Sequence, residues 1–304
     1  MYTTLTRVLY EDKGAEAGAA VPGAVSLTAL FTAIQKVTAR IKAIAWDFEP
    51  HYGTEYFTAG GDNVNISWGE LVLTNPKGQQ LLLASATDVP VIMLNGQAIT
   101  FGLTSASSPV CLPYPQNYTP IKALRLNDAN YSIWRTWYPT CLPWIDNITV
   151  TGFWGYRKDY SNAFIDSLYS VQDSLGINAT VTTITVTNVS GADALFWSPR
   201  FDAGNLIRID NELILILATN TTANTLSVRR GVNGTTKAAH ALNTDITIWY
   251  PETDLMDTVS RQAAYFYSRR GSYEAIAVQG VATAVYPPDM VDELWAMLQG
   301  YQNE

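Results

Sequence analysis

The sequence predicts an α+β fold with a helical core, small β-strands within that core, and a separate all-β module inserted into it. Three observations support this prediction: a helical apolar pattern after Ser26, short β-type runs between turn residues over 56–156 and 170–250, and a second helical pattern after Pro251. The 304 residues suffice for one large domain or two ordinary ones. We expect 1–168 and 251–304 to form the core, and 169–250 to form a small barrel or sandwich.

The first helix is expected to begin at Ser26 and to end before Pro50. Ser26 is placed to accept the unpaired amides of a first helical turn. Leu30, Ile34 and Ile41 then recur at helical spacing, which predicts an amphipathic helix with one apolar face.

Short strands are expected in two blocks after this helix. In the first block, Asn95-Gly96 lies between β-type runs and is a strong signal for a hairpin, and 145–156 reads as a closing strand. In the second block, Asp210-Asn211 reads as a turn. The strands expected there are 181–187, 206–210, 212–218 and 226–229.

Two helices are expected to close the chain. The first runs from Glu252 to Arg270, with acidic residues in its first turn and Gly271 just beyond its end. The second begins at Pro287-Pro288, since proline suits the first turn of a helix. Its apolar stripe consists of Val291, Leu294, Trp295 and Leu298.

The composition favours a protein that associates with other subunits. Charged residues make up 15% of the chain, against about 25% in average soluble domains. Much of the surface must therefore be neutral, and the 17 tyrosines and 9 tryptophans are of the kind that subunit contacts use. The net charge of −8 disfavours sequence-specific binding of nucleic acid.

The residue types offer little material for catalysis, for a metal or for a membrane. There are only two histidines, in distant segments, so we expect no metal, no cofactor and no enzymatic activity. Asp210 and Glu212 are two residues apart, which leaves a glycan-cleaving carboxylate pair as an alternative. No secretory signal and no apolar run of about 20 residues is present, so we expect a soluble protein made in the cytoplasm.

Several segments, taken in order, carry a family resemblance. Thr54-Glu-Tyr-Phe57, Tyr118-Thr-Pro-Ile-Lys-Ala-Leu-Arg-Leu126 and Val150-Thr-Gly-Phe-Trp-Gly-Tyr156 follow the first helix, and a helix pair closes the chain. This order resembles the head-to-tail connector (adaptor) proteins of tailed bacteriophages, except that here a proline follows Tyr118-Thr119. The segment Arg230-Gly-Val-Asn-Gly-Thr-Thr-Lys-Ala-Ala-His240 is similar to a small β module recurrent in phage virion proteins.

The resemblance implies a structural protein of the virion, made in the host cytoplasm and placed where head and tail meet. It implies a ring of about twelve identical subunits, closed by a heterologous interface. The ring would dock on the portal protein, present a platform to a tail terminator or other neck and tail proteins, and let genomic DNA pass without sequence recognition.

Particular residues are assigned to these contacts as expectations. The last helix would enter a groove on the portal, although its stripe could instead pack on its own subunit. The portal-docking residues would be Val291, Leu294, Trp295, Leu298 and Tyr301. The candidates for the ring interface are Leu30, Ile34, Ile41, Arg229, Arg230, Val259, Phe266, Arg269 and Arg270.

A carbohydrate-binding or tail-tip protein is the alternative from another class. Its aromatic side chains would stack on sugars. The long helices expected at both ends argue against it, because sugar-binding β modules do not need them. The candidate stacking residues are Trp134, Trp137, Trp144 and Trp154.

Overall fold

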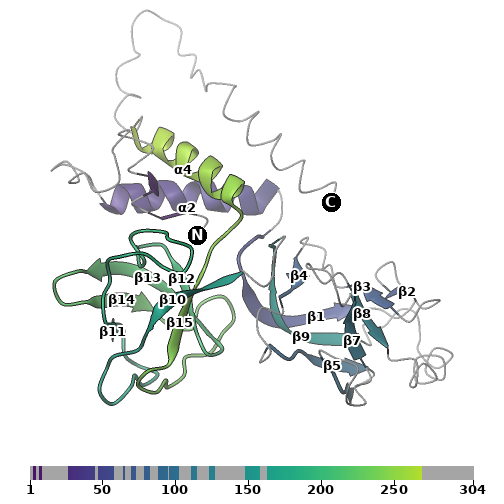
Figure 1. Cartoon of the computed structure of the whole chain (residues 1–304). Coiled ribbons are helices and arrows are strands. Elements are labelled where there is room, and N and C mark those ends of the chain that lie inside the picture. The colour runs from purple at the N-terminus through teal and green to yellow at the C-terminus, as the bar shows by residue number, and fades with distance from the viewer. Residues whose placement is uncertain are drawn as a thin grey trace, which may run out of the picture. The chain divides into compact units, whose positions relative to one another are not determined.

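The structure is a computed structural model, and its described residues form two compact units (Figure 1). Unit 1 comprises Met1–Trp46, Ile165–Arg230 and Lys237–Glu304, and unit 2 comprises Asp47–Phe164 and Gly231–Thr236. The described residues are 3–4, 7–8, 27–44, 47–57, 64–65, 70–72, 79–82, 88–94, 96–102, 111–114, 123–126, 148–157 and 163–268.

The prediction of a helical core with small strands is wrong, because the fold is mostly β. Among the described residues, the helices are α2 (Leu27–Ile44) and α4 (Thr253–Ser268), and the other elements are antiparallel strands. The physical reason is long-range pairing: Thr54 lies opposite Thr151, 97 residues later in the chain. Runs that look like minor additions along the sequence thus combine into sheets that supply most of the core.

Unit 2 is built on β9, which is the central strand of a sheet with the order β1-β9-β5-β6. The turn at Gly96, where φ is 78°, connects β5 to β6, so the expected hairpin is confirmed. A smaller sheet has the order β2-β3-β8-β7. The strands are β1 (His51–Phe57), β2 (Val64–Asn65), β3 (Glu70–Val72), β4 (Gln80–Leu81, also paired with β9), β5 (Val91–Leu94), β6 (Gln97–Ile99), β7 (Cys111–Tyr114), β8 (Ala123–Leu126) and β9 (Ile148–Gly155).

One face of the β9 sheet supplies the core of unit 2. Ile148, Val150 and Trp154 alternate along β9 and are fully buried, as the period of two in a strand requires. They cluster with Phe57 and Ile92 of the neighbouring strands. The indole nitrogen of Trp154 donates a hydrogen bond to a backbone carbonyl at 3.2 Å, so this buried ring leaves no donor unpaired.

The sheet of unit 1 has six strands in the order β10-β15-β12-β13-β14-β11. β12 and β13 form a hairpin through the two-residue turn Asp210-Asn211, as expected, and Asp210 has the positive φ (50°) that such turns use at their first position. β10 and β15, the first and last strands of this sheet along the chain, are neighbours in it. The strands are β10 (Phe164–Ser170), β11 (Thr183–Thr185), β12 (Leu206–Ile209), β13 (Glu212–Asn220), β14 (Thr225–Arg229) and β15 (Asp245–Trp249).

The two helices of unit 1 pack against one another (Figure 1). Leu30, Ile34 and Ile41 form the buried stripe of α2, and Leu255 and Val259 are buried on α4. The helices expected from Ser26 and Glu252 are therefore confirmed, with the bounds given above. Within the described part of the chain, neither helix is long and apolar enough to cross a membrane. The expected last helix lies outside the described residues.

Candidate functional site

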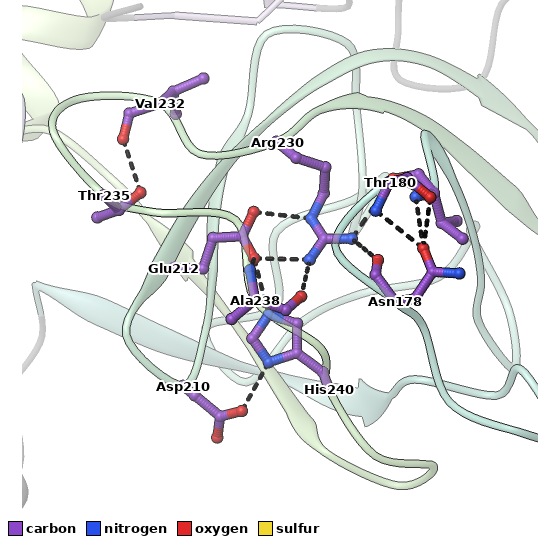
Figure 2. Close-up of polar contacts among 10 residues, drawn as sticks. Asn178, Thr180, Asp210, Glu212, Arg230, Val232, Thr235, Ala238 and His240 are labelled. Atoms are coloured by element: carbon purple, nitrogen blue, oxygen red, sulfur yellow. Dashed lines mark hydrogen bonds and ion pairs between the residues drawn. The ribbon is translucent and has the colours of Figure 1, made fainter.

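A buried carboxylate, Glu212, forms the centre of the polar cluster in unit 1 (Figure 2). It is the first residue of β13, directly after the Asp210-Asn211 turn, and its side chain has no exposed surface. The guanidinium of Arg230 donates to both of its oxygens, from Nε to Oε1 at 2.7 Å and from Nη2 to Oε2 at 2.6 Å. Such a bidentate, charge-assisted pair is stronger and more specific in geometry than a single hydrogen bond between neutral groups.

Arg230 uses its remaining donors on backbone carbonyls of the same unit. Nη1 donates to the carbonyls of Asn178 and Val181, at 3.1 Å and 3.4 Å, and Nη2 also donates to the carbonyl of Ala238 at 2.6 Å. Each guanidinium nitrogen of Arg230 is therefore bonded within the chain. Arg230 acts as a link that holds two loop segments, 178–181 and the one at Ala238, to Glu212.

His240 completes the cluster and connects it to the surface. Its Nδ1 lies 2.7 Å from Oδ2 of Asp210, and its Nε2 lies 2.9 Å from Oε2 of Glu212. The backbone of His240 is fixed as well, since it exchanges hydrogen bonds of 2.8 Å and 2.9 Å with Ile177. The imidazole is buried, whereas the side chain of Asp210 is 60% exposed.

The surroundings of Glu212 keep it ionised. Burial by itself raises the pKa of this carboxyl, but hydrogen bonds from Arg230, the Ala238 amide and His240 outweigh burial and lower the pKa from 4.5 to about 2. A buried carboxylate that stays ionised down to about pH 2 and is held on all sides has no route to a substrate. The geometry therefore gives no support to a carboxylate pair that cleaves glycans.

The conspicuous sequence segment from Arg230 to His240 is explained by this cluster. Its first and last residues meet at Glu212, and the amide of Ala238 donates to Glu212 at 3.0 Å. Between them, Gly234 has a φ of 82°, and a Cβ there would collide with the carbonyl oxygen of Tyr52. The hydroxyl of Thr235 closes the turn by donating to a carbonyl at 2.8 Å. The structure therefore accounts for the arginine, glycine, threonine and histidine of this segment.

The ring-interface candidates mostly lie inside the chain. Leu30, Ile34, Ile41 and Val259 have no exposed surface and pack in the core of unit 1. Because these side chains are buried, they stabilise the packing of α2 on α4. Their part in an interface between subunits stays a prediction. Arg230 is buried as described, Phe266 is half-buried, and Arg229 is exposed. Arg269, Arg270 and the portal-docking residues Val291, Leu294, Trp295, Leu298 and Tyr301 lie outside the described residues.

A rigid turn in unit 1 displays an aromatic side chain to solvent. Phe196 is 89% exposed and has a φ of 64°, a conformation that bulky residues rarely adopt. The buried carboxylate of Asp193 fixes this turn, because its Oδ1 accepts the amides of Leu195 and Trp197 at 2.9 Å and 3.0 Å. Trp197 stacks on Tyr250 with ring centroids 5.7 Å apart, which anchors the turn to the core.

A second exposed residue with the same backbone strain lies beside this turn. Leu168 has a φ of 63° and is 55% exposed. Its amide donates to Oδ1 of Asp166 at 2.7 Å, and the carbonyl of Asp166 accepts the amide of Ala194 at 3.2 Å. The two strained turns are thus joined by their backbones. We call Leu168, Leu195 and Phe196 the apolar turn surface.

Among the described residues of unit 2, one face of the β9 sheet carries no charged side chain. Tyr52 and Tyr56 project from β1 on this face, and Tyr56 is 62% exposed. Val91 of β5 lies opposite Thr151, which lies opposite Thr54, so these three side chains project from the same side. We call this the uncharged sheet face. Its residues are Tyr52, Thr54, Tyr56, Val91, Met93, Ala98, Thr149 and Thr151, with the buried Phe153 on the same side of the sheet.

Neither surface was expected from the sequence, although a weak signal exists for the uncharged sheet face. In the alternating strands at 51–57 and 148–155, the residues between the buried ones are uncharged, and this was visible in advance. The carbohydrate alternative is affected as well: Trp154 is fully buried, while Trp134, Trp137 and Trp144 lie outside the described residues. Among the described residues, no group of three or more His, Cys, Asp or Glu side chains is placed to hold a metal ion.

No protein-family model matches the chain, and no curated protein matches it. The resemblance to phage connectors therefore stays a prediction based on the sequence segments described above.

Proposed function

We propose that this chain is a structural protein of a bacteriophage virion, a head-to-tail adaptor whose copies form a ring between portal and tail. The observation that carries the proposal is the uncharged sheet face of unit 2. An exposed surface that carries tyrosines and no charge has the composition found at the centre of protein interfaces. The helical core is not part of this proposal, because the fold is mostly β.

The polar cluster supports a structural role over a catalytic one. Glu212, Arg230 and His240 satisfy one another and the backbone around them, and their shared effect is to fix the loops of the β module. A functional acid or base needs access to its substrate and a pKa near the working pH. Glu212 has neither.

The partners follow from the same proposal. The ring would bind the portal protein on one side and neck or tail proteins on the other, and DNA would pass through it without sequence recognition. The net charge of −8 fits a channel that does not hold DNA, because like charges repel.

The experiment is a mass measurement of the purified chain, alone and mixed with a portal ring, by native mass spectrometry and light scattering. We expect a closed ring, or recruitment of many copies onto the portal. A protein that stays monomeric and ignores the portal would refute the adaptor proposal, and binding to a glycan array would then favour the carbohydrate alternative.

A further inference from the structure

We propose that the exposed face of α2 contacts the phosphate backbone of double-stranded DNA without reading its sequence. The inference rests on the proposed function, in which DNA passes through the ring, and it names the residues that the DNA meets. The chemistry is that of cationic side chains on a rigid helix beside a regular polyanion.

The charge of α2 is opposite in sign to the charge of the rest of the chain. Its 18 residues include three basic ones, Lys36, Arg40 and Lys42, and no acidic one. The whole chain has a net charge of −8, so the remainder is more acidic still. Lys42 has a local explanation, because the helix dipole stabilises a cation in the last turn. Lys36 and Arg40 precede that turn, so the dipole does not account for them.

Lys36 and Arg40 are neighbours on one side of α2. Residues four apart on a helix lie close together, and like charges at this spacing repel each other. Both side chains are exposed, and within the described part of the chain no carboxylate forms an ion pair with either of them. A helix face that is merely solvated usually alternates positive and negative charges. The two cations are therefore uncompensated.

The residues around these two cations are small or neutral. Ala39 and Ala43 leave room for a polymer backbone to approach, and Gln35 adds an amide donor of the kind that phosphate contacts use. The opposite side of α2 is buried and packs against α4, which fixes the direction of the exposed side (Figure 1). We call the exposed side the basic helix face. Its residues are Thr28, Thr32, Gln35, Lys36, Ala39, Arg40 and Ala43.

DNA is the partner that this composition fits. Contacts to phosphate use arginine, lysine and glutamine and need no apolar anchor. The centre of a protein interface is instead depleted of charge and rich in aromatic residues, and the basic helix face has no aromatic or long aliphatic side chain. A helix that binds an anionic membrane inserts apolar residues, but the apolar stripe of α2 is buried within its own unit.

The acidic remainder of the chain keeps this contact weak. Two phosphate contacts supply little affinity by themselves, and the surrounding negative charge repels DNA. Contacts that do not depend on sequence also allow DNA to slide. The basic helix face would thus guide DNA without holding it.

The test is fluorescence anisotropy of a labelled, random-sequence duplex of about 20 base pairs, roughly two helical turns. We expect wild-type affinity to fall about tenfold between about 50 and 200 mM salt, as two phosphate contacts predict. The double variant Lys36→Gln/Arg40→Gln should bind at least about tenfold more weakly at the lower salt concentration and lose most of this salt dependence. Glutamine is a good helix former, and circular dichroism checks that α2 is retained.

The double variant Arg229→Gln/Lys237→Gln is the matched control. It removes the same two charges from exposed positions of unit 1 that lie outside α2. We expect it to bind DNA within about twofold of the wild type, because the contact depends on where the cations lie. Equal losses in the two double variants would overturn the inference, since net charge alone would then explain the binding.

The remaining outcomes separate this inference from the adaptor proposal. A wild type that forms rings or binds the portal but ignores DNA would overturn the DNA contact and leave the adaptor standing. A monomeric wild type that ignores the portal but binds DNA through the basic helix face would do the reverse. Binding of poly-glutamate without binding of the duplex would assign this face to an acidic protein and refute the DNA contact.

Discussion

Removing the guanidinium of Arg230 while keeping Glu212 should strongly destabilise unit 1. Arg230→Met keeps an unbranched apolar stem of similar reach but removes both bonds to the carboxylate and the three bonds to backbone carbonyls. The ionised Glu212 is then left buried with its histidine and amide partners alone. We expect the free energy of unfolding to fall by about 3 to 5 kcal/mol, the range found when one partner of a buried ion pair is removed.

The shift in the pKa of Glu212 gives an independent estimate of the same size. The pKa falls from 4.5 to about 2, which is about 2.5 units, and each unit corresponds to about 1.4 kcal/mol. The surroundings of Glu212, with burial opposing its hydrogen bonds, thus favour its charged form by a net amount on the order of 3 kcal/mol. Because His240 and the Ala238 amide contribute to this value, the loss of Arg230 alone accounts for only part of it. The three lost carbonyl contacts add to the cost.

The assay is urea unfolding, followed by tryptophan fluorescence, with hydrogen exchange to locate the effect. We expect the amides of β12, β13 and the 177–181 segment to exchange faster in the Arg230→Met variant. Arg229→Met is the control, because Arg229 is exposed and should change stability by less than about 0.5 kcal/mol. A loss below about 1 kcal/mol for Arg230→Met would refute the view that this cluster holds the β module together.

Three further predictions follow from the same geometry. The folded-state pKa of Glu212 is lowered, so its ionised form stabilises the fold above about pH 4.5, and this stabilisation is lost as the pH falls through about 2. In an acid titration of unfolding, the Glu212→Gln variant should lack this part of the loss in stability. Gly234→Ala should cost more than about 2 kcal/mol in thermal unfolding, since its Cβ meets the Tyr52 carbonyl, whereas Gly96→Ala, with open space around it, should cost about 1 kcal/mol. An equal cost for the two glycine variants would contradict the packing argument. Phe196→Gly should raise the free energy of unfolding by up to about 1 kcal/mol by relieving the positive φ; a destabilised variant would mean that the phenylalanine ring packs within its own chain.

Local signals in the sequence predicted local structure well. Ser26 and Pro251 marked the two helices, and Asn95-Gly96 and Asp210-Asn211 marked two hairpins, because these features depend on neighbours within a few residues. The fold class was mispredicted for the opposite reason. The strands form the core by pairing between distant segments such as β1 and β9. No local sequence pattern specifies that pairing.

In the candidate site too, the local features were predictable and the long-range contacts were not. The spacing of Asp210 and Glu212 was visible, and it suggested catalysis as an alternative to an ordinary turn. The actual partner of Glu212 is an arginine 18 residues further along, and only the folded sheet brings the two together. Phe196 was missed because residue type predicts burial for a phenylalanine, while its exposure depends on a turn fixed by a buried aspartate.

The neighbouring positions of β10 and β15 have a consequence for how such a chain can be altered. The amide of Val171 donates to the carbonyl of Thr244 at 3.0 Å, and Asn243 returns a bond to Val171 at 2.9 Å, so the two strands run antiparallel. The start of β10 therefore lies beside the end of β15. A segment whose ends meet in this way can be exchanged, lengthened or deleted with little change to the geometry at the junction. Exchange of the segment between them is therefore expected to occur at these two strands.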